Sequence, residues 1–392
     1  MSDDSAAENR GRLKELALLF LRLGFTAFGG PSAHIVMMEH EVVVRRKWVD
    51  RRHFLDLVAA VNFVPGPNST ELAIHLGFIR AGFAGLAVAG VCFITPAVLI
   101  ILPLAWMYVQ WGALPQAAHV LSAINAAIVA IIGAALWRFS KSSVVDSFTG
   151  VVAAITVVFA LVMSRFPQYQ PDLIALGAAA VAGAIHYARP KALHVTPLLI
   201  PLLNVDSRNL MRAALLFLKI GATLFGSGYV LVSYLQHNFV DQTDWLTRQE
   251  LLDSIAVGQV TPGPLLTTAT FIGYVLGQRF LGTTLGAVVG AIACTVAIFS
   301  PSFLFIALLG RVLPRIRANR YARGALNAVN AAVMALIFVV VLRLGQSSLA
   351  PNGQMRVLNV LIAAVSFALL AVWDVNSTWL VIGAGLVGAV AR

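Results

Sequence analysis

Two short proline-glycine-proline sequences are the residues of this chain best suited to chemistry inside an apolar environment. Pro65-Gly66-Pro67 is followed by Asn68, Ser69 and Thr70, and Pro262-Gly263-Pro264 is followed after two leucines by Thr267 and Thr268. Two prolines remove two amide donors and bar a continuous helix, so each sequence predicts a break and then a new helix start. The free amides and positive dipole end of such a start, together with the hydroxyl groups, favour binding of an anion. The alternative is a kinked helix that these hydroxyls only cap.

Glycines and cations occupy matching places ahead of the two breaks. Gly29 and Gly30 correspond to the cluster around Gly226, where tight helix packing and ligand contact are equally compatible with the sequence. Arg22 and Lys219 lie at equivalent places inside apolar runs. A cation there is costly and would attract an oxyanion, unless its side chain extends to the membrane surface.

Titratable groups near the breaks are candidates for proton coupling. Asp56 and Asp253 lie nine residues before the first proline of each break, where capping of a helix is the alternative role. Glu71 follows the first break, and His75 shares its helix face at a spacing of four residues. Glu71 is the leading candidate for carrying a proton. Its counterpart in the second break is Thr268.

The elements that position these residues are predicted to be membrane helices. Hydrophobic residues make up 59% of the 392 residues and charged residues only 11%, too few to cover a soluble surface. Apolar runs of helical length recur along the chain, without the alternation of a membrane barrel. The net charge of +11 comes from basic residues between these runs, which is typical of cytoplasmic loops and not of a nucleic-acid-binding protein. Neither metal-ligand spacing nor a phosphate-binding loop is present, so we expect no metal, no cofactor and no enzyme activity.

An internal repeat divides the chain. At an offset of 197 residues, Gly24 matches Gly221, Trp48 matches Trp245 and the two breaks coincide; later the offset becomes 205, as for Asn125 and Asn330. We therefore expect homologous halves at 1–195 and 205–392, joined by a linker at 196–204.

The charges of equivalent loops predict that the halves are inverted. Residues 45–52 carry five basic side chains and their counterpart 241–248 carries one, whereas 311–323 carry five arginines and their counterpart 110–119 carries none. Because basic loops prefer the cytoplasm, equivalent loops lie on opposite sides, as in many secondary transporters. The predicted fold is an all-α membrane protein with about five crossings in each half. Each half also contains a broken, re-entrant helix at Pro-Gly-Pro.

Several longer strings carry a family resemblance. They are FGGPSAH at 28–34, VPGP at 64–67, FLKIGATLFGSGYV at 217–230, LLDSIAVGQVTPGPLLTTATFIGY at 251–274 and FSPSF at 299–303. With them the chain resembles the long, two-half form of the chromate ion transporter family over nearly its whole length. The resemblance implies an antiporter of the bacterial inner membrane that exports chromate at the expense of the proton-motive force and confers chromate resistance.

Alternative functions remain open at the level of sequence. Sulfate has nearly the shape and charge of chromate, so a transporter of sulfate or another oxyanion is the first alternative. An integral-membrane enzyme acting on lipid headgroups would need an acid–base pair, for which only Glu71 and His75 qualify, and a passive channel is a third alternative. The expected partners are the oxyanion, protons and the lipid bilayer. The sequence does not define the oligomeric state, and a homodimer is one of the states it allows.

Overall fold

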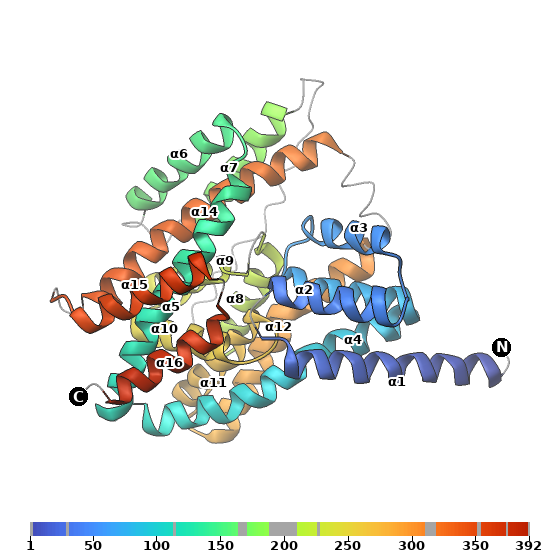
Figure 1. Cartoon of the computed structure of the whole chain (residues 1–392), viewed down its shortest axis with the longest axis horizontal. Coiled ribbons are helices and arrows are strands. Elements are labelled where there is room, and N and C mark those ends of the chain that lie inside the picture. Colours follow the sequence, from blue (N-terminus) through green and yellow to red (C-terminus); the bar gives the residue numbers. More distant parts are fainter. Residues whose placement is uncertain are drawn as a thin grey trace.

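Every regular element in the described part of the chain is a helix (Figure 1). The computed structural model describes residues 3–28, 31–112, 115–163, 171–187, 210–225, 228–309, 319–350, 354–373 and 375–390. The helices of the first half are α1 (Asp3–Thr26), α2 (Pro31–Glu39), the π-helix η1 (His40–Arg45), α3 (Arg51–Val61), α4 (Asn68–Trp111), α5 (Pro115–Ser143), α6 (Ser147–Met163) and α7 (Pro171–Tyr187). Those of the second half are α8 (Leu210–Thr223), α9 (Val230–Leu235), the π-helix η3 (Gln236–Gln242), α10 (Arg248–Val260), the short 3₁₀ helix η4 (Leu265–Thr267), α11 (Thr268–Leu281), α12 (Thr284–Leu309), α14 (Arg320–Leu349), α15 (Val357–Val372) and α16 (Ser377–Val390). The prediction of an all-α membrane protein is confirmed.

The two halves carry their helices in the same order. The chain reverses within α4 at Ala81 and Gly82, where Gly82 has a φ of 60°, so α4 consists of two helices. These correspond to α11 and α12, which are separated by Gly282 with a φ of 66°. Positive φ at both reversals is the conformation that glycine adopts without strain. The order of elements agrees with the predicted repeat, and the inverted orientation of the halves remains a prediction.

The described helices differ in whether they are long enough to cross a membrane. Among the described residues, four stretches are long and apolar enough to cross a membrane, namely 68–111, 117–143, 284–308 and 320–349. The apolar helices α6, α7, α15 and α16 contain 14 to 17 residues. At about 1.5 Å per residue these helices are shorter than a hydrocarbon core of about 30 Å. The apolar runs at 13–30 and 210–235 are interrupted, because α1 ends at Thr26 and α8 at Thr223. Five crossings per half therefore stays a prediction.

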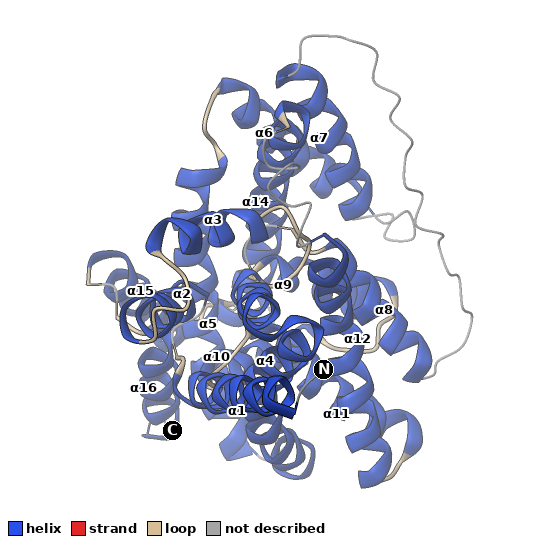
Figure 2. Cartoon of the chain, turned by 90° about the vertical axis from the view of Figure 1, so that its right-hand side faces the viewer, coloured by secondary structure: helices blue, strands red, loops and turns tan. Residues whose placement is uncertain are grey.

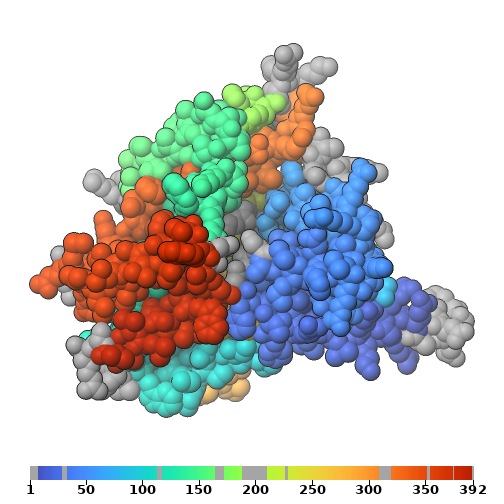
Figure 3. Space-filling model, viewed as in Figure 1, coloured from blue at the N-terminus to red at the C-terminus, as the bar shows by residue number. Residues whose placement is uncertain are grey.

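The helices pack into two groups that do not follow the division of the sequence into halves. One group, here called the break bundle, consists of α1–α4 with α8 and α10–α12, and within it α4 packs on α1, α11 and α12; α9 packs instead on α14. The other, the paired bundle, joins α5–α7 of the first half to α14–α16 of the second, with α14 against α7 and α5 against α15 and α16 (Figures 1 and 2). On the face shown in Figure 3, the first 60 residues and the last 40 lie on opposite sides. Helix α10 contacts both bundles, since it packs on α11 and on α5 and α16.

Matched glycines bring the first helix of each half close to the helix beyond the break. A Cβ atom at Gly24 of α1 would lie 2.8 Å from the Phe93 carbonyl oxygen in α4. A Cβ at Gly221 of α8 would overlap the Ile298 carbonyl oxygen in α12. Small residues allow such backbone approach between membrane helices. This packing holds the ends of α1 and α8 beside the two breaks.

Candidate functional site

The two Pro-Gly-Pro breaks interrupt helices as predicted, and each is bonded to the opposite half. Helix α3 ends before Pro65 and α4 begins at Asn68, while α10 ends before Pro262 and η4 begins after Pro264. The Gly66 amide donates to the Leu224 carbonyl at 2.7 Å, and the Gly263 amide donates to the Ala27 carbonyl at 3.1 Å. Leu224 and Ala27 are equivalent residues in the repeat, so these bonds are reciprocal, as a two-fold relation between the halves requires. The breaks and the ends of α1 and α8 therefore form one buried junction.

Buried polar atoms without partners concentrate at the first break. Thr70, Glu71 and Ser302 are fully buried, and His75 is 5% exposed. The Thr70 hydroxyl and His75 Nδ1 have no hydrogen-bond partner among the described residues, and the Ser302 hydroxyl and the Glu71 carboxyl have no partner there except each other. Glu71 Oε1 and Ser302 Oγ both lie against the Cα of Gly66, where a Cβ would overlap them. Because unpaired buried polar groups are costly, a ligand that supplied hydrogen-bond partners here would be stabilised.

The second break satisfies its own hydroxyls. Thr267 donates to the Pro264 carbonyl at 2.7 Å, and Thr268 donates to the Leu265 carbonyl at 2.8 Å. The residue equivalent to Ser302 is Ala97, which lies nearest to a Cβ built at Gly263, at 3.1 Å. The two breaks therefore match in backbone but differ in free polar groups, and the binding role predicted for both remains a prediction.

His34 is a buried residue that the sequence analysis did not single out. Its Nε2 lies 3.0 Å from the Ala27 carbonyl, the same oxygen that accepts from Gly263, and its Nδ1 lies 3.2 Å from Ser69 Oγ. A carbonyl can only accept, so Nε2 carries the proton and Nδ1 accepts from the serine hydroxyl. His34 thereby bridges the two breaks as a neutral imidazole. A single histidine in an otherwise apolar run was the available signal.

Asp56 and Asp253 differ in environment although they are equivalent in sequence. Asp253 is 1% exposed and accepts hydrogen bonds from the Tyr108 hydroxyl at 2.8 Å, Asn125 at 2.7 Å and Gln249 at 3.2 Å. Asp56 is exposed. Neither aspartate caps its helix, because the N-caps of α3 and α10 are Asp50 and Thr247. Asp253 joins α10 to α4 and α5, which fits a structural tie better than a free proton acceptor.

Arg22 and Lys219 have different partners. Arg22 forms an ion pair with Glu41 of η1 at 3.5 Å, and Lys219 lies 3.4 Å from the Asn238 side-chain oxygen in η3. Glu41 and Asn238 are equivalent residues. The predicted attraction of these two cations for an oxyanion remains a prediction.

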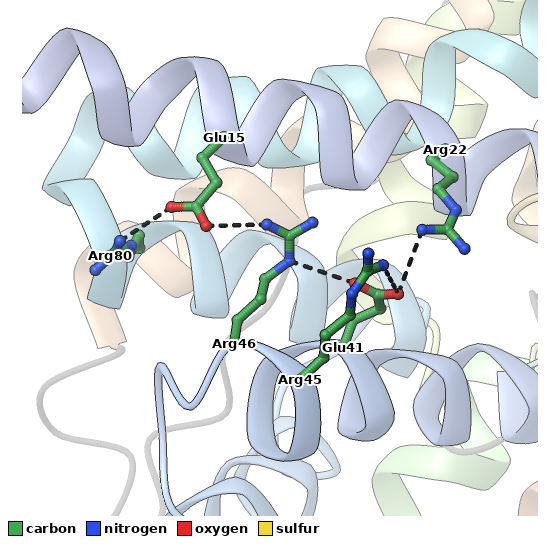
Figure 4. Close-up of polar contacts among 6 residues, drawn as sticks. All are labelled: Glu15, Arg22, Glu41, Arg45, Arg46 and Arg80. Atoms are coloured by element: carbon green, nitrogen blue, oxygen red, sulfur yellow. Dashed lines mark hydrogen bonds and ion pairs between the residues drawn. The ribbon is translucent and has the colours of Figure 1, made fainter.

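The Arg22–Glu41 pair is part of a larger ionic network that joins α1, η1 and the tip of the α4 hairpin (Figure 4). Arg45 and Arg46 contact Glu41 at 3.2 and 3.3 Å, and Arg46 and Arg80 contact Glu15 at 2.9 and 3.0 Å. Burial by itself raises the pKa of Glu41, but the hydrogen bonds from Arg45 and Arg46 and the charges of Arg45 and Arg22 outweigh it and lower the pKa.

The remaining predicted residues lie at the junction or outside the described ranges. Pro65, Gly66, Pro67, Pro262, Gly263 and Pro264 are buried, and the Asn68 side chain donates to Asn62 across the first break at 2.6 Å. Gly29, Gly30 and Gly226 lie outside the described residues, so their predicted role remains a prediction.

Comparisons with known proteins agree with a transporter. The sequence profile of the family described as "Chromate transporter" matches residues 14–184 and 211–389. The "Chromate transport protein" of Cupriavidus metallidurans is 29% identical over 403 residues, which cover 97% of this chain and 93% of that protein. The "Probable chromate transport protein" of Synechococcus elongatus is 29% identical over 348 residues, 86% of each chain.

A shorter relative matches only part of the chain. The "Uncharacterized transporter YwrB" of Bacillus subtilis is 26% identical over 174 residues, which cover 44% of this chain and 87% of that protein. No solved structure matches the chain. The profile matches cover both breaks and nearly all of the described helices, and the relatives are named as transport proteins. The chain is therefore a multi-pass membrane protein that belongs to the chromate transporter family.

Proposed function

We propose that this protein is a secondary active transporter that exports chromate or a similar tetrahedral oxyanion across the inner membrane, and so confers chromate resistance. The names of the relatives support chromate as the cargo. The observation that carries the proposal is the first break, where a helix start, the unpartnered Thr70 hydroxyl and the Glu71–Ser302 pair are buried together.

The first break offers the donors that an oxyanion needs. The amides of Asn68, Ser69 and Thr70 at the start of α4 precede its first intrahelical bond, which the Glu71 amide donates to the Pro67 carbonyl, so they are available to a ligand. The Thr70 and Ser302 hydroxyls add two donors from two different halves of the chain. A ligand held between them would contact α4 of the first half and α12 of the second, and would lie within the break bundle.

Glu71 binds the coupling proton in this proposal. An ionised carboxylate beside a dianion is repelled, so the oxyanion binds when Glu71 is protonated, and the protonated group adds another donor. The proton then travels with the oxyanion, and one negative charge crosses the membrane in each cycle. An inside-negative potential drives that charge outward with about 2.3 kcal/mol per 100 mV. Because the oxyanion binds together with the proton, joint movement of both is favoured over the exchange that an antiporter would perform.

Alternating access arises between the break bundle and the paired bundle in this proposal. The order of elements, the reciprocal hydrogen bonds and the half-length Bacillus relative support an origin from two homologous halves, 1–195 and 205–392. The packing, however, joins helices of both halves in each bundle, so we expect the bundles and not the halves to move as bodies. Helix α10 contacts both bundles and carries the second break at its end, which makes it the expected hinge.

Chromate uptake by inverted membrane vesicles tests the function. We expect uptake that increases with an imposed membrane potential and that is absent from vesicles without the protein. Uptake that ignores the potential would indicate a carrier of neutral species and contradict the proposal. Counterflow with labelled sulfate tests the alternative cargo, since equal exchange of sulfate would identify a general carrier of tetrahedral oxyanions. Lipid turnover without chromate flux would instead support the membrane enzyme.

A further inference from the structure

A cavity bounded by α6, α7, α9, η3 and α14 contains a second set of buried polar groups that the proposed function does not use. The cavity has a volume of about 30 Å³, which suits a single small ion or water molecule. Its polar lining consists of Asp172, Ser233, Gln236, His237, Asp241 and Arg343. Alanine, leucine, valine and methionine side chains complete the wall.

Three of the polar residues in this cavity have unpartnered atoms. Asp172 Oδ2, Gln236 Oε1 and His237 Nε2 lack hydrogen-bond partners among the described residues, and their residues are 8%, 1% and 7% exposed. Two of these atoms are oxygens that can only accept while Asp172 is ionised, and the imidazole nitrogen accepts in one of its tautomers. A ligand that fills this cavity must therefore donate hydrogen bonds or carry positive charge.

The neighbouring charged groups are already matched with one another. Arg343 of α14 donates to Asp241 Oδ2 of η3 at 3.2 Å, and Gln236 donates to Asp241 Oδ1 at 2.8 Å. Lys219 of α8 lies within electrostatic range of Asp172. Tyr234 of α9 donates to the Thr223 carbonyl at 2.9 Å. The two acids, Asp172 and Asp241, balance the two bases, Lys219 and Arg343, so the cluster is neutral and does not attract an anion. The Asp172 Oδ2 atom still lacks a hydrogen-bond partner.

We propose that this cavity is a second ion site that binds one positive charge, either a proton on Asp172 or a sodium ion held by the Asp172 carboxylate. The Gln236 side-chain oxygen and the Ser233 hydroxyl supply the further oxygens that a sodium ion requires. The site belongs to one half only, because the residue equivalent to Asp172 is Ser377.

The site is connected to the first break through one helix. Lys219 and Leu224 lie five residues apart at the end of α8, and the Leu224 carbonyl accepts from the Gly66 amide. A positive charge bound at Asp172 weakens the attraction between the Asp172 carboxylate and Lys219. One of the interactions that position α8 is thereby weakened. Occupancy of the cavity thereby acts on the break, which is how an ion that does not touch the oxyanion can regulate its binding.

Thermal unfolding of the purified full-length protein tests the ion site without chromate. The unfolding midpoint is measured by tryptophan fluorescence in two series. In the first, the pH is varied without sodium. In the second, the concentration of sodium chloride is varied and compared with choline chloride, at the highest pH that the protein tolerates. The wild-type midpoint should fall as pH rises and Asp172 loses its proton, because a buried unpaired charge is costly. A rise with sodium but not with choline identifies the sodium ion, and a response to pH alone identifies the proton.

Variants assign the response to the cavity. Asp172→Asn removes the carboxylate charge, so the unfolding midpoint of this variant should respond less to pH and sodium than that of the wild type. Asp172→Ser also lacks the carboxylate and provides a second variant. Asp244→Asn removes an exposed acid just beyond η3 and should keep the wild-type response. The proposal is overturned if Asp172→Asn and Asp172→Ser respond as the wild type does, or if the wild type responds to neither ion. Failure of chromate transport in vesicles would reject the proposed function and leave this result unaffected.

Discussion

Replacing Glu71 with glutamine tests how the proton and the oxyanion move together. The glutamine side chain has nearly the same size as the buried glutamate and mimics its protonated form. The variant should therefore bind chromate without a proton. Each cycle would then carry two negative charges in place of one.

The expected magnitude follows from the work of moving charge across the membrane. One charge corresponds to about 2.3 kcal/mol at 100 mV, and two charges to about 4.6 kcal/mol. Since about 1.4 kcal/mol is a factor of ten, the limiting chromate gradient at 100 mV is about 50-fold for the wild type and about 2,000-fold for Glu71→Gln. The pH dependence of transport should also disappear in the variant.

Proteoliposomes with a potassium diffusion potential provide the assay. The chromate ratio at equilibrium is measured against voltage, at equal pH on both sides, and its slope gives the charge per cycle. Glu39→Gln is a matched control, because Glu39 lies in the same bundle and pairs with Arg51 at 3.2 Å, away from the break. Equal slopes for wild type and Glu71→Gln would refute the role of Glu71. A wild-type slope of three charges would show that the proton is exchanged for the oxyanion.

Four further perturbations test the surrounding structure. Gly66→Ala should abolish transport without loss of membrane insertion, since a Cβ there would overlap Glu71 and Ser302. Gly263→Ala shares the strain of a positive φ but has its nearest neighbour at 3.1 Å, so it should be milder, and equal effects in vesicle uptake would contradict this asymmetry. His34→Leu removes the bridge between the breaks and leaves a buried serine hydroxyl unpaired, which should lower stability by about 1–3 kcal/mol in denaturant titrations. Asp253→Ala leaves buried donors unpaired and should cost a similar amount for each, and an unchanged midpoint would show that α10 is held by other contacts. The pKa of Glu41 is lowered, so its ion pairs stabilise the fold above about pH 4.5, the ordinary pKa of a glutamate. This contribution is lost as the pH falls below that value. The unfolding free energies of wild type and Glu41→Gln should therefore become equal in acid.

Local chemistry made part of the site predictable. Proline lacks an amide donor and restricts the preceding residue, so the positions of both breaks could be inferred without any knowledge of packing. The same applies to the helical class, because a chain with 11% charged residues cannot cover a soluble surface. The family resemblance was likewise carried by contiguous strings around these breaks.

The division of roles between equivalent residues was not predictable. Asp56 and Asp253 occupy the same place in the repeat, yet only Asp253 is buried, because Tyr108 and Asn125 approach it from other helices. Arg22 and Lys219 likewise interact with different partners, since Arg22 pairs with Glu41 whereas Lys219 lies near Asn238 and within electrostatic range of Asp172. Such partners come from sequence separations of up to 145 residues, and no local pattern reports them.

The sequence by itself determined that this is a helical membrane protein. It also determined where two of the helices break and that these two breaks are matched. These properties follow from the backbone chemistry of proline and from composition. Only the tertiary structure decided that Ser302 faces Glu71 at Gly66, that the second break satisfies its own hydroxyls and that Asp172 lines a separate cavity. Whether a buried polar atom has a partner depends on helices brought together by packing, and that arrangement joins the two halves instead of separating them.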